Sequence, residues 1–222
     1  MKPRRFALAL SLAWTLAGSV CVVSLGAATT AACPAAGAKC LPDTPAIVFY
    51  TDSAASATFW PPFFAALHHE LAQANPANQL PASARLIVAG DQSVDPGVSN
   101  VIVVHLEGRC DQPRQAWRPL APGAALGWVY KSPGRIQPRI QPFVFVDCAR
   151  IAQLLDPVTL GMSDDLRVEA MDTAIARVLL HEWIHISLQT ADHTEHGIRQ
   201  PRLTARDLTA IDDLRASREP EP

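Results

Sequence analysis

Short apolar runs and longer segments of helical spacing follow one another along the chain. Runs rich in Ile and Val, bounded by Gly, Pro, Asp or Asn, predict strands at residues 46–50, 85–89 and 100–106, and two further runs predict strands at 125–131 and 142–147. Apolar residues that recur every three or four positions predict helices at residues 63–74, 148–155, 166–189 and 205–216. The pattern therefore predicts an α+β domain, in which a sheet precedes a central helix and a last helix ends the fold.

The predicted helix ends depend on local signals. Residues 166–189 contain no Gly or Pro and are apolar on nearly every face, which predicts a central, buried helix that begins after the polar residues 163–165. Asn75-Pro76 and Asp156-Pro157 predict the ends of the first two helices. Thr204 and Asp207 approximate a capping box for the last helix. Residues 112–123 contain three prolines and predict a surface loop.

The N-terminus predicts export. Lys2, Arg4 and Arg5 precede an apolar run over residues 6–28, and no acidic residue precedes Asp43. This arrangement is typical of a signal peptide.

The fate of that segment has three interpretations. Cleavage after Ala28 or Ala32 fits the small-residue rule, but the run is also long enough to remain as a membrane anchor. Thr30-Ala31-Ala32-Cys33 loosely resembles a lipoprotein cleavage site. We expect residues 1–32 to be a signal peptide or N-terminal anchor, residues 33–45 a flexible lead, and residues 46–222 the folded domain.

The cysteines agree with export. Cys21 lies within the signal, which leaves Cys33, Cys40, Cys110 and Cys148, an even number for an oxidising compartment. Two disulfides are predicted, Cys33 with Cys40 and Cys110 with Cys148. The alternative for the second pair is two buried free thiols.

Composition limits the class of protein. The chain has 222 residues, 49% of them hydrophobic, and a formal net charge of −2, which is typical of one globular domain. No basic run occurs after the first five residues, so we expect no nucleic-acid partner.

The candidate chemistry lies in His181-Glu182-Trp183-Ile184-His185, inside the predicted central helix. Residues four apart lie on the same helix face, so both imidazoles can reach one ion, and the sequence predicts a Zn²⁺ site. Glu182 is offset from the ion and is placed to act as the general base toward water activated by the metal.

A catalytic zinc needs a third protein ligand and an open position. The helix must end after Gln189, and the residues that follow can reverse the chain so that His193 reaches the ion. His196 and Glu195 are the alternatives, and Asp192 could orient a ligand.

The remaining histidines favour other roles. His68-His69-Glu70 lies on the first predicted helix, where a solvated face is expected. His105 alternates within a strand and is expected to pack or cap. The sequence does not place Tyr50, Tyr130 or Arg199 relative to the metal.

The C-terminal part resembles the active segment of zincin-type metallopeptidases, and especially exported bacterial metzincin-like domains of largely unassigned function. The matching residues are Arg177-Val178-Leu179-Leu180-His181-Glu182, His185, His193, His196-Gly197-Ile198, Leu203-Thr204 and Leu208. The resemblance implies a zincin-like fold, a mixed sheet packed on the active-site helix, and zinc-dependent hydrolysis.

Two departures separate the chain from the usual metzincin pattern. Leu188 and Ala191 occupy the positions of the usual Gly and third His, so the third ligand comes two residues later. The Met expected near Ile198 and Arg199 is also absent.

We therefore predict an exported zinc metallopeptidase that hydrolyses peptide bonds in a peptide or protein substrate. His181, His185 and His193 would hold the metal and Glu182 would activate water. Residues 125–131 could bind the peptide as a sheet edge. The alternatives are a non-catalytic exported protein with a structural zinc, and an amidase that acts on cell-wall peptides.

Overall fold

The computed structural model describes residues 44–52, 55–78, 80–90, 100–113, 125–133 and 139–209, and all of them belong to one compact unit, Leu41–Pro222. The predicted signal or anchor, most of the flexible lead and the predicted Cys33–Cys40 disulfide lie outside the described residues. None of the helices that the structure describes combines the length and the apolar character needed to cross a membrane.

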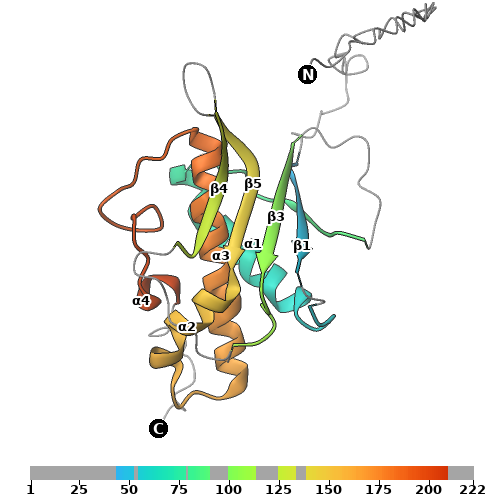
Figure 1. The fold of residues 1–222 in the computed structure, drawn as a ribbon, viewed down its shortest axis with the longest axis vertical. Coiled ribbons are helices and arrows are strands. Elements are labelled where there is room, and N and C mark those ends of the chain that lie inside the picture. The colour runs from blue at the N-terminus through green and yellow to red at the C-terminus, as the bar shows by residue number, and fades with distance from the viewer. Residues whose placement is uncertain are drawn as a thin grey trace, which may run out of the picture. The chain divides into compact units, whose positions relative to one another are not determined.

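Within the described residues, five strands form one mixed sheet and four helices accompany it (Figure 1). The strands are β1 (Ala46–Thr51), β2 (Arg85–Val88), β3 (Val101–Glu107), β4 (Gly127–Ser132) and β5 (Arg139–Asp147), and the helices are α1 (Trp60–Asn78), α2 (Cys148–Thr159), α3 (Asp164–Leu188) and α4 (Ala205–Leu208). The α+β class and the mixed sheet predicted from the sequence are confirmed.

The strand order is β2-β1-β3-β5-β4. The first four strands in this order pair in parallel, whereas β4 pairs antiparallel with β5. The predicted strand at 125–131 therefore lies at an edge of the sheet, although it begins at Gly127. The strand predicted at 142–147 begins earlier, at Arg139.

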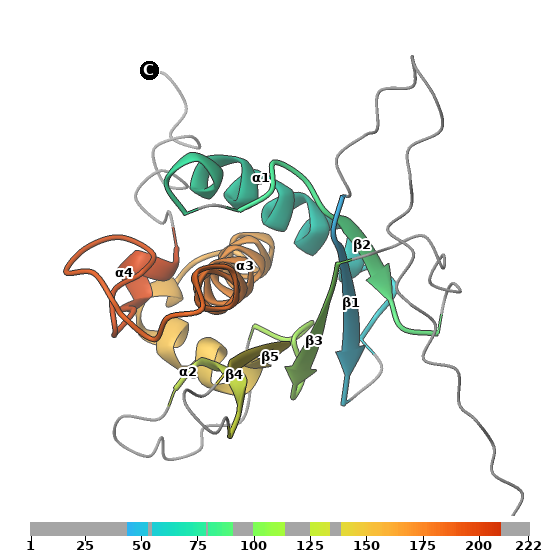
Figure 2. The same ribbon diagram turned by 90° about the horizontal axis from the view of Figure 1, so that it is seen from above.

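Helices α1 and α3 lie on one side of the sheet, and α3 lies between α1 on one side and α2 and α4 on the other (Figure 2). The side chains that point toward the helices form the main core, with Phe49 of β1, Val104 of β3 and Val144 of β5 at most 1% exposed. Central residues of α3 such as Leu179 complete this core. The prediction of a buried central helix is confirmed.

Local signals define the ends of α3 and α4. The Ser163 hydroxyl accepts from the Leu166 amide, and Gln189 ends α3 in a left-handed conformation with φ 50°. Thr204 and Asp207 form the predicted capping box of α4. The structure describes α4 as Ala205–Leu208, and the remainder of the helix predicted to residue 216 is outside the described residues.

Two predicted helix ends were wrong. Helix α1 continues past Pro76 to Asn78, whose side-chain amide donates to the Ala74 carbonyl. Helix α2 continues past Pro157 to Thr159, whose hydroxyl donates to the Leu155 carbonyl. In each case the proline lies in the last turn, so its missing N–H removes one hydrogen bond at the end of the helix, and a side chain beyond it donates to a nearby carbonyl.

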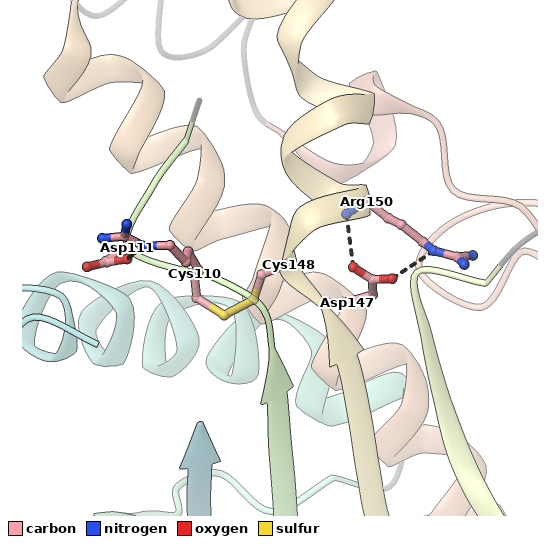
Figure 3. Close-up of a disulfide and its surroundings, with 6 residues drawn as sticks. Cys110, Asp111, Asp147, Cys148 and Arg150 are labelled. Atoms are coloured by element: carbon pink, nitrogen blue, oxygen red, sulfur yellow. Dashed lines mark hydrogen bonds and ion pairs between the residues drawn. A yellow bond between two sulfur atoms is a disulfide. The ribbon is translucent and has the colours of Figure 1, made fainter. Parts of the chain in front are cut away.

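The predicted disulfide between Cys110 and Cys148 is confirmed (Figure 3). The two Cα atoms are 5.0 Å apart, and the bond joins the segment after β3 to the first residue of α2. Both side chains are buried. The bond thus anchors the sheet to the helix that precedes α3.

Candidate metal centre

Two histidines one turn apart on α3 point toward the same place. The Nε2 atoms of His181 and His185 are 3.1 Å apart, as the four-residue spacing predicts. His193, on the segment after α3, completes the group, and one ligand atom from each of the three residues lies within 4.8 Å of the others.

Backbone carbonyls orient both helical histidines. Nδ1 of His181 is 2.6 Å from the Ile198 carbonyl oxygen, and Nδ1 of His185 is 2.7 Å from the Thr190 carbonyl oxygen. A carbonyl only accepts, so Nδ1 must be the donor in both rings, and in a neutral imidazole Nε2 then carries a lone pair. Two lone pairs therefore face one another across 3.1 Å.

Such an arrangement needs a positive charge between the nitrogens. A proton fits poorly, because burial lowers the pKa of His181 to about 4. Burial also lowers the pKa of His185. A metal ion fits well, since two nitrogens bound at about 2.0–2.1 Å and tetrahedral angles are separated by about 3.3 Å. The donor set and its geometry therefore suit a metal ion.

The segment after α3 brings His193 back toward the helix. The Gln189 side chain bridges the backbone of Ile140 on β5, with its oxygen 3.2 Å from the amide nitrogen and its nitrogen 3.0 Å from the carbonyl oxygen. The Thr190 hydroxyl donates to Asp192 and accepts from the Asp192 amide, which forms a tight local turn. Asp192 thus stabilises the turn whose Thr190 carbonyl holds His185.

The alternatives to His193 are not brought to the site. Among the described residues, the three histidines are the only group of His, Cys, Asp or Glu side chains with metal-ligand spacing. Glu195 and His196 are exposed on the same segment, and the His196 carbonyl accepts from Thr194.

Glu182 lies beside the histidines and faces the edge strand. Its side chain is 7% exposed, and burial raises its pKa to about 7, while the nearby positive charge of Lys131 acts in the opposite direction. A bound metal ion would oppose this rise further. Gly127 permits the close contact, because a Cβ atom there would lie 3.2 Å from Cγ of Glu182 and 2.7 Å from Cγ1 of Val178.

The three histidines and Glu182 open into a cleft of about 1010 Å³. One wall is the edge strand β4, the floor is α3, and the opposite wall is the segment that follows His193. The remaining lining residues are Ala125, Leu126, Gly127, Trp128, Val129, Lys131, Arg150, Leu154, Val178, Ala191, Gln200, Pro201, Arg202 and Leu203.

On the first helix, α1, one residue differs from the sequence prediction. His68 and His69 are exposed, as predicted, and Nε2 of His69 is 2.6 Å from the Gln73 amide nitrogen. Glu70, in contrast, is buried and forms two hydrogen bonds with the Arg177 guanidinium at 2.9 and 3.1 Å. The expectation of a solvated face was wrong for Glu70, because its carboxylate has a cation opposite it on α3.

The other candidate side chains lie in two places. His105 pairs with Asp52 at 2.8 Å and packs edge-on against Phe145, so the prediction of a packing role is confirmed. Tyr50 lines a separate pocket with His105 and Phe145, away from the metal centre. Arg199 is near the metal centre, since its charge lowers the pKa of both His181 and His185.

Sequence reasoning missed four contributors to the site. Gly127 had a recognisable signal, because an isolated glycine inside a strand often marks a close approach of another element. Lys131 and the two carbonyl acceptors had no such signal, since their positions depend on the packing of the folded chain.

Comparisons with family models, with curated proteins and with solved structures found no match to this chain.

Proposed function

We propose that this chain is an exported, zinc-dependent peptidase with a zincin-like fold. The observation that carries the proposal is the pair of Nε2 lone pairs 3.1 Å apart, with His193 as a third ligand and Glu182 beside them. Three imidazoles without a thiolate suit Zn²⁺ in an open, catalytic type of site. The Cys110–Cys148 disulfide supports an oxidising compartment.

The arrangement of the sheet also supports a zincin-like domain. The antiparallel edge strand β4 borders the helix that carries both ligands, and together they form the cleft. An extended peptide could add through main-chain hydrogen bonds to the outer edge of β4, which pairs with no further strand among the described residues. This would place a peptide carbonyl between the edge strand and the three histidines.

When bound, a zinc ion would polarise that carbonyl and lower the pKa of water. Protein residues would transfer the protons and orient the metal ligands. The Glu182 carboxylate accepts a proton from the attacking water and returns it to the leaving amine nitrogen. The carbonyls of Ile198 and Thr190 keep the two imidazoles in the tautomer that presents Nε2 to the ion.

Elemental analysis of the purified full chain tests the metal site. We expect about one zinc per chain, strongly reduced in His193→Ala and retained in the matched His196→Ala control. Absence of zinc from wild-type protein that has been folded with zinc present would overturn the site.

Glu182→Gln tests catalysis separately from metal binding. We expect this variant to retain zinc and to lose cleavage of a peptide library by about a hundredfold or more. Wild-type activity in Glu182→Gln would exclude Glu182 as the general base, whereas no cleavage by zinc-loaded wild type would favour a structural metal.

A further inference from the structure

The charges that line the cleft are unequal. Among the described residues that line the cleft, Glu182 is the one acidic residue, whereas Lys131, Arg150 and Arg202 are basic. These cations come from three different elements, and whether each is available to a substrate depends on its partners within the protein.

Arg150 is already neutralised. Its Nε is 2.7 Å from an Asp147 carboxylate oxygen, and the other oxygen of Asp147 accepts from the Arg150 amide (Figure 3). Its guanidinium also reaches the Ala125 carbonyl at 3.4 Å. Arg150 therefore holds the segment ahead of β4 in place and has little charge left for a substrate.

Lys131 differs from Arg150 in that its charge is not neutralised by an ion pair with a described residue. Within the described residues it has no acidic partner, and side-chain alternation along β4 puts it on the same face as Gly127 and Val129, toward α3. A register shift between β4 and β5 leaves Lys131 opposite Ile140. Lys131 lines the same cleft as Glu182 and His185, and its positive charge acts electrostatically on both.

Arg202 supplies a second cation from the opposite wall. It is exposed, lines the cleft and forms no ion pair with any residue that the structure describes. Arg199, three residues earlier, adds positive charge near His181. Lys131 and Arg202 thus present positive charge from the two walls between which an extended chain would lie.

We propose that the cleft selects acidic peptides, with an Asp or Glu side chain close to the cleaved bond, and that Lys131 and Arg202 determine this specificity. The inference rests on the proposed peptidase function and names its substrate class. A neutral peptide would desolvate both cations without compensation, whereas a carboxylate would pair with one of them. Glu182 is needed for the reaction and is not available as their partner.

The position of Lys131 limits where the acidic residue lies. Gly127 is next to Glu182, and Lys131 is four residues further along the strand, or about 13 Å at about 3.3 Å per residue. A peptide paired with β4 would therefore place its carboxylate within about four residues of the cleaved bond.

The test uses the zinc-loaded full chain and matched fluorogenic peptides in which one residue at each position near the cleaved bond is Glu, Gln or Lys. We expect kcat/KM to be about fivefold or more higher for the best Glu peptide than for its Gln counterpart, and less so at high salt. Lys131→Glu should reverse the order in favour of the Lys peptide. Lys131→Arg should keep the wild-type order.

Arg85→Glu is the matched control for the change in charge. Arg85 is exposed on β2, at the opposite edge of the sheet from β4, so this variant should keep the wild-type preference. Binding gives a second readout that does not need turnover. In zinc-loaded Glu182→Gln, calorimetry should give a lower Kd for the Glu peptide than for the Gln peptide, and Arg202→Gln should reduce the difference.

The outcomes separate the two proposals. Equal kcat/KM and Kd for Glu and Gln peptides, with cleavage intact, would overturn the acidic specificity and leave the peptidase in place. An unchanged preference in Lys131→Glu would also overturn it. Failure to cleave any peptide, with tighter binding of the Glu peptide retained, would overturn the peptidase and support the anionic subsite.

Discussion

Gly127 on β4 and Glu182 on α3 lie so close together that a methyl group at position 127 would be 3.2 Å from Cγ of Glu182. The same methyl group would be 2.7 Å from Cγ1 of Val178, one turn earlier on the helix. The absence of a side chain at this position is therefore what allows the edge strand to approach the helix at the proposed general base.

Gly127→Ala should damage both stability and catalysis. The added carbon must displace either the strand or the side chains of α3, which lowers the free energy of unfolding by about 1–3 kcal/mol. A shift of Glu182 should lower kcat/KM by about tenfold to a hundredfold, while the zinc content is unchanged. Chemical denaturation, peptide kinetics and elemental analysis measure the three quantities.

The double variant Gly127→Ala/Val178→Ala provides the control. Removing the Val178 methyl groups opens space at the shortest of the three close contacts, so the double variant should be more stable than the sum of the single changes predicts. Simple additivity would contradict the proposed clash.

The ion pair between Glu70 and Arg177 should be a major link between α1 and α3. Both side chains are largely buried, and the Arg177 guanidinium also donates to the Asp207 carbonyl at 3.0 Å. Glu70→Gln leaves a buried cation without its counter-charge, so we expect a loss of about 3 kcal/mol in the free energy of unfolding. Denaturant titration measures it.

Glu195→Gln is the comparison for that experiment, because it removes an exposed carboxylate from the segment that follows α3. It should change stability by less than about 0.5 kcal/mol. Equal effects of the two variants would show that the Glu70 pair contributes no more than a surface charge.

The main elements of the fold and the three histidines of the metal site could be predicted from local patterns in the sequence. Apolar runs and helical spacing located the strands and α3, because those patterns follow from which side chains must be buried. The spacing of His181 and His185 placed both rings on one helix face, and the end of α3 after Gln189 made His193 the expected third member. Each of these inferences uses only residues close in the sequence.

What could not be predicted depends on partners far away in the chain. Glu70 is buried because Arg177 lies opposite it, although 107 residues separate them. Lys131 faces the cleft in a strand whose register with β5 shifts between Val129 and Lys131. Neither the ion pair nor the position of Lys131 is indicated by neighbouring residues in the sequence, so both became visible only in the folded structure.

The disulfide between Cys110 and Cys148 should contribute substantially to stability. It closes a loop across a sequence separation of 38 residues. The chain-entropy model then predicts a loss of about 4 kcal/mol when it is removed. The Cys110→Ser/Cys148→Ser variant should have a lower Tm than the wild type in a thermal melt.

A reducing agent separates the contribution of the covalent disulfide to the Tm from that of the packing of the two side chains. It should lower the Tm of the wild type and leave the Tm of the double Ser variant unchanged. If the wild type were equally stable with and without reductant while its thiols became reactive, the entropic contribution assigned to this bond would be incorrect.

Asp172 on α3 should make the stability of the domain depend on pH. It is 2% exposed, and its Oδ2 has no hydrogen-bond partner in the described part of the chain. Burial, together with the Glu169 carboxylate, raises its pKa from 3.8 to about 7. Between these values the folded state binds more protons than the unfolded state. This group's contribution to stability is therefore complete below about pH 4 and is lost as the pH rises to about 7, by up to about 1.4 kcal/mol per pH unit.

Asp172→Asn removes the titrating group and should be more stable than the wild type at neutral pH. The difference in the free energy of unfolding should grow between about pH 4 and pH 7 and then stay level, because the wild-type carboxyl is ionised in both states above that window. Any titration of the histidines is common to both proteins and cancels in the difference. Asp165→Asn, on the exposed first turn of α3, controls for the change in net charge. A difference that is independent of pH would mean that Asp172 ionises in the folded protein as readily as in the unfolded chain.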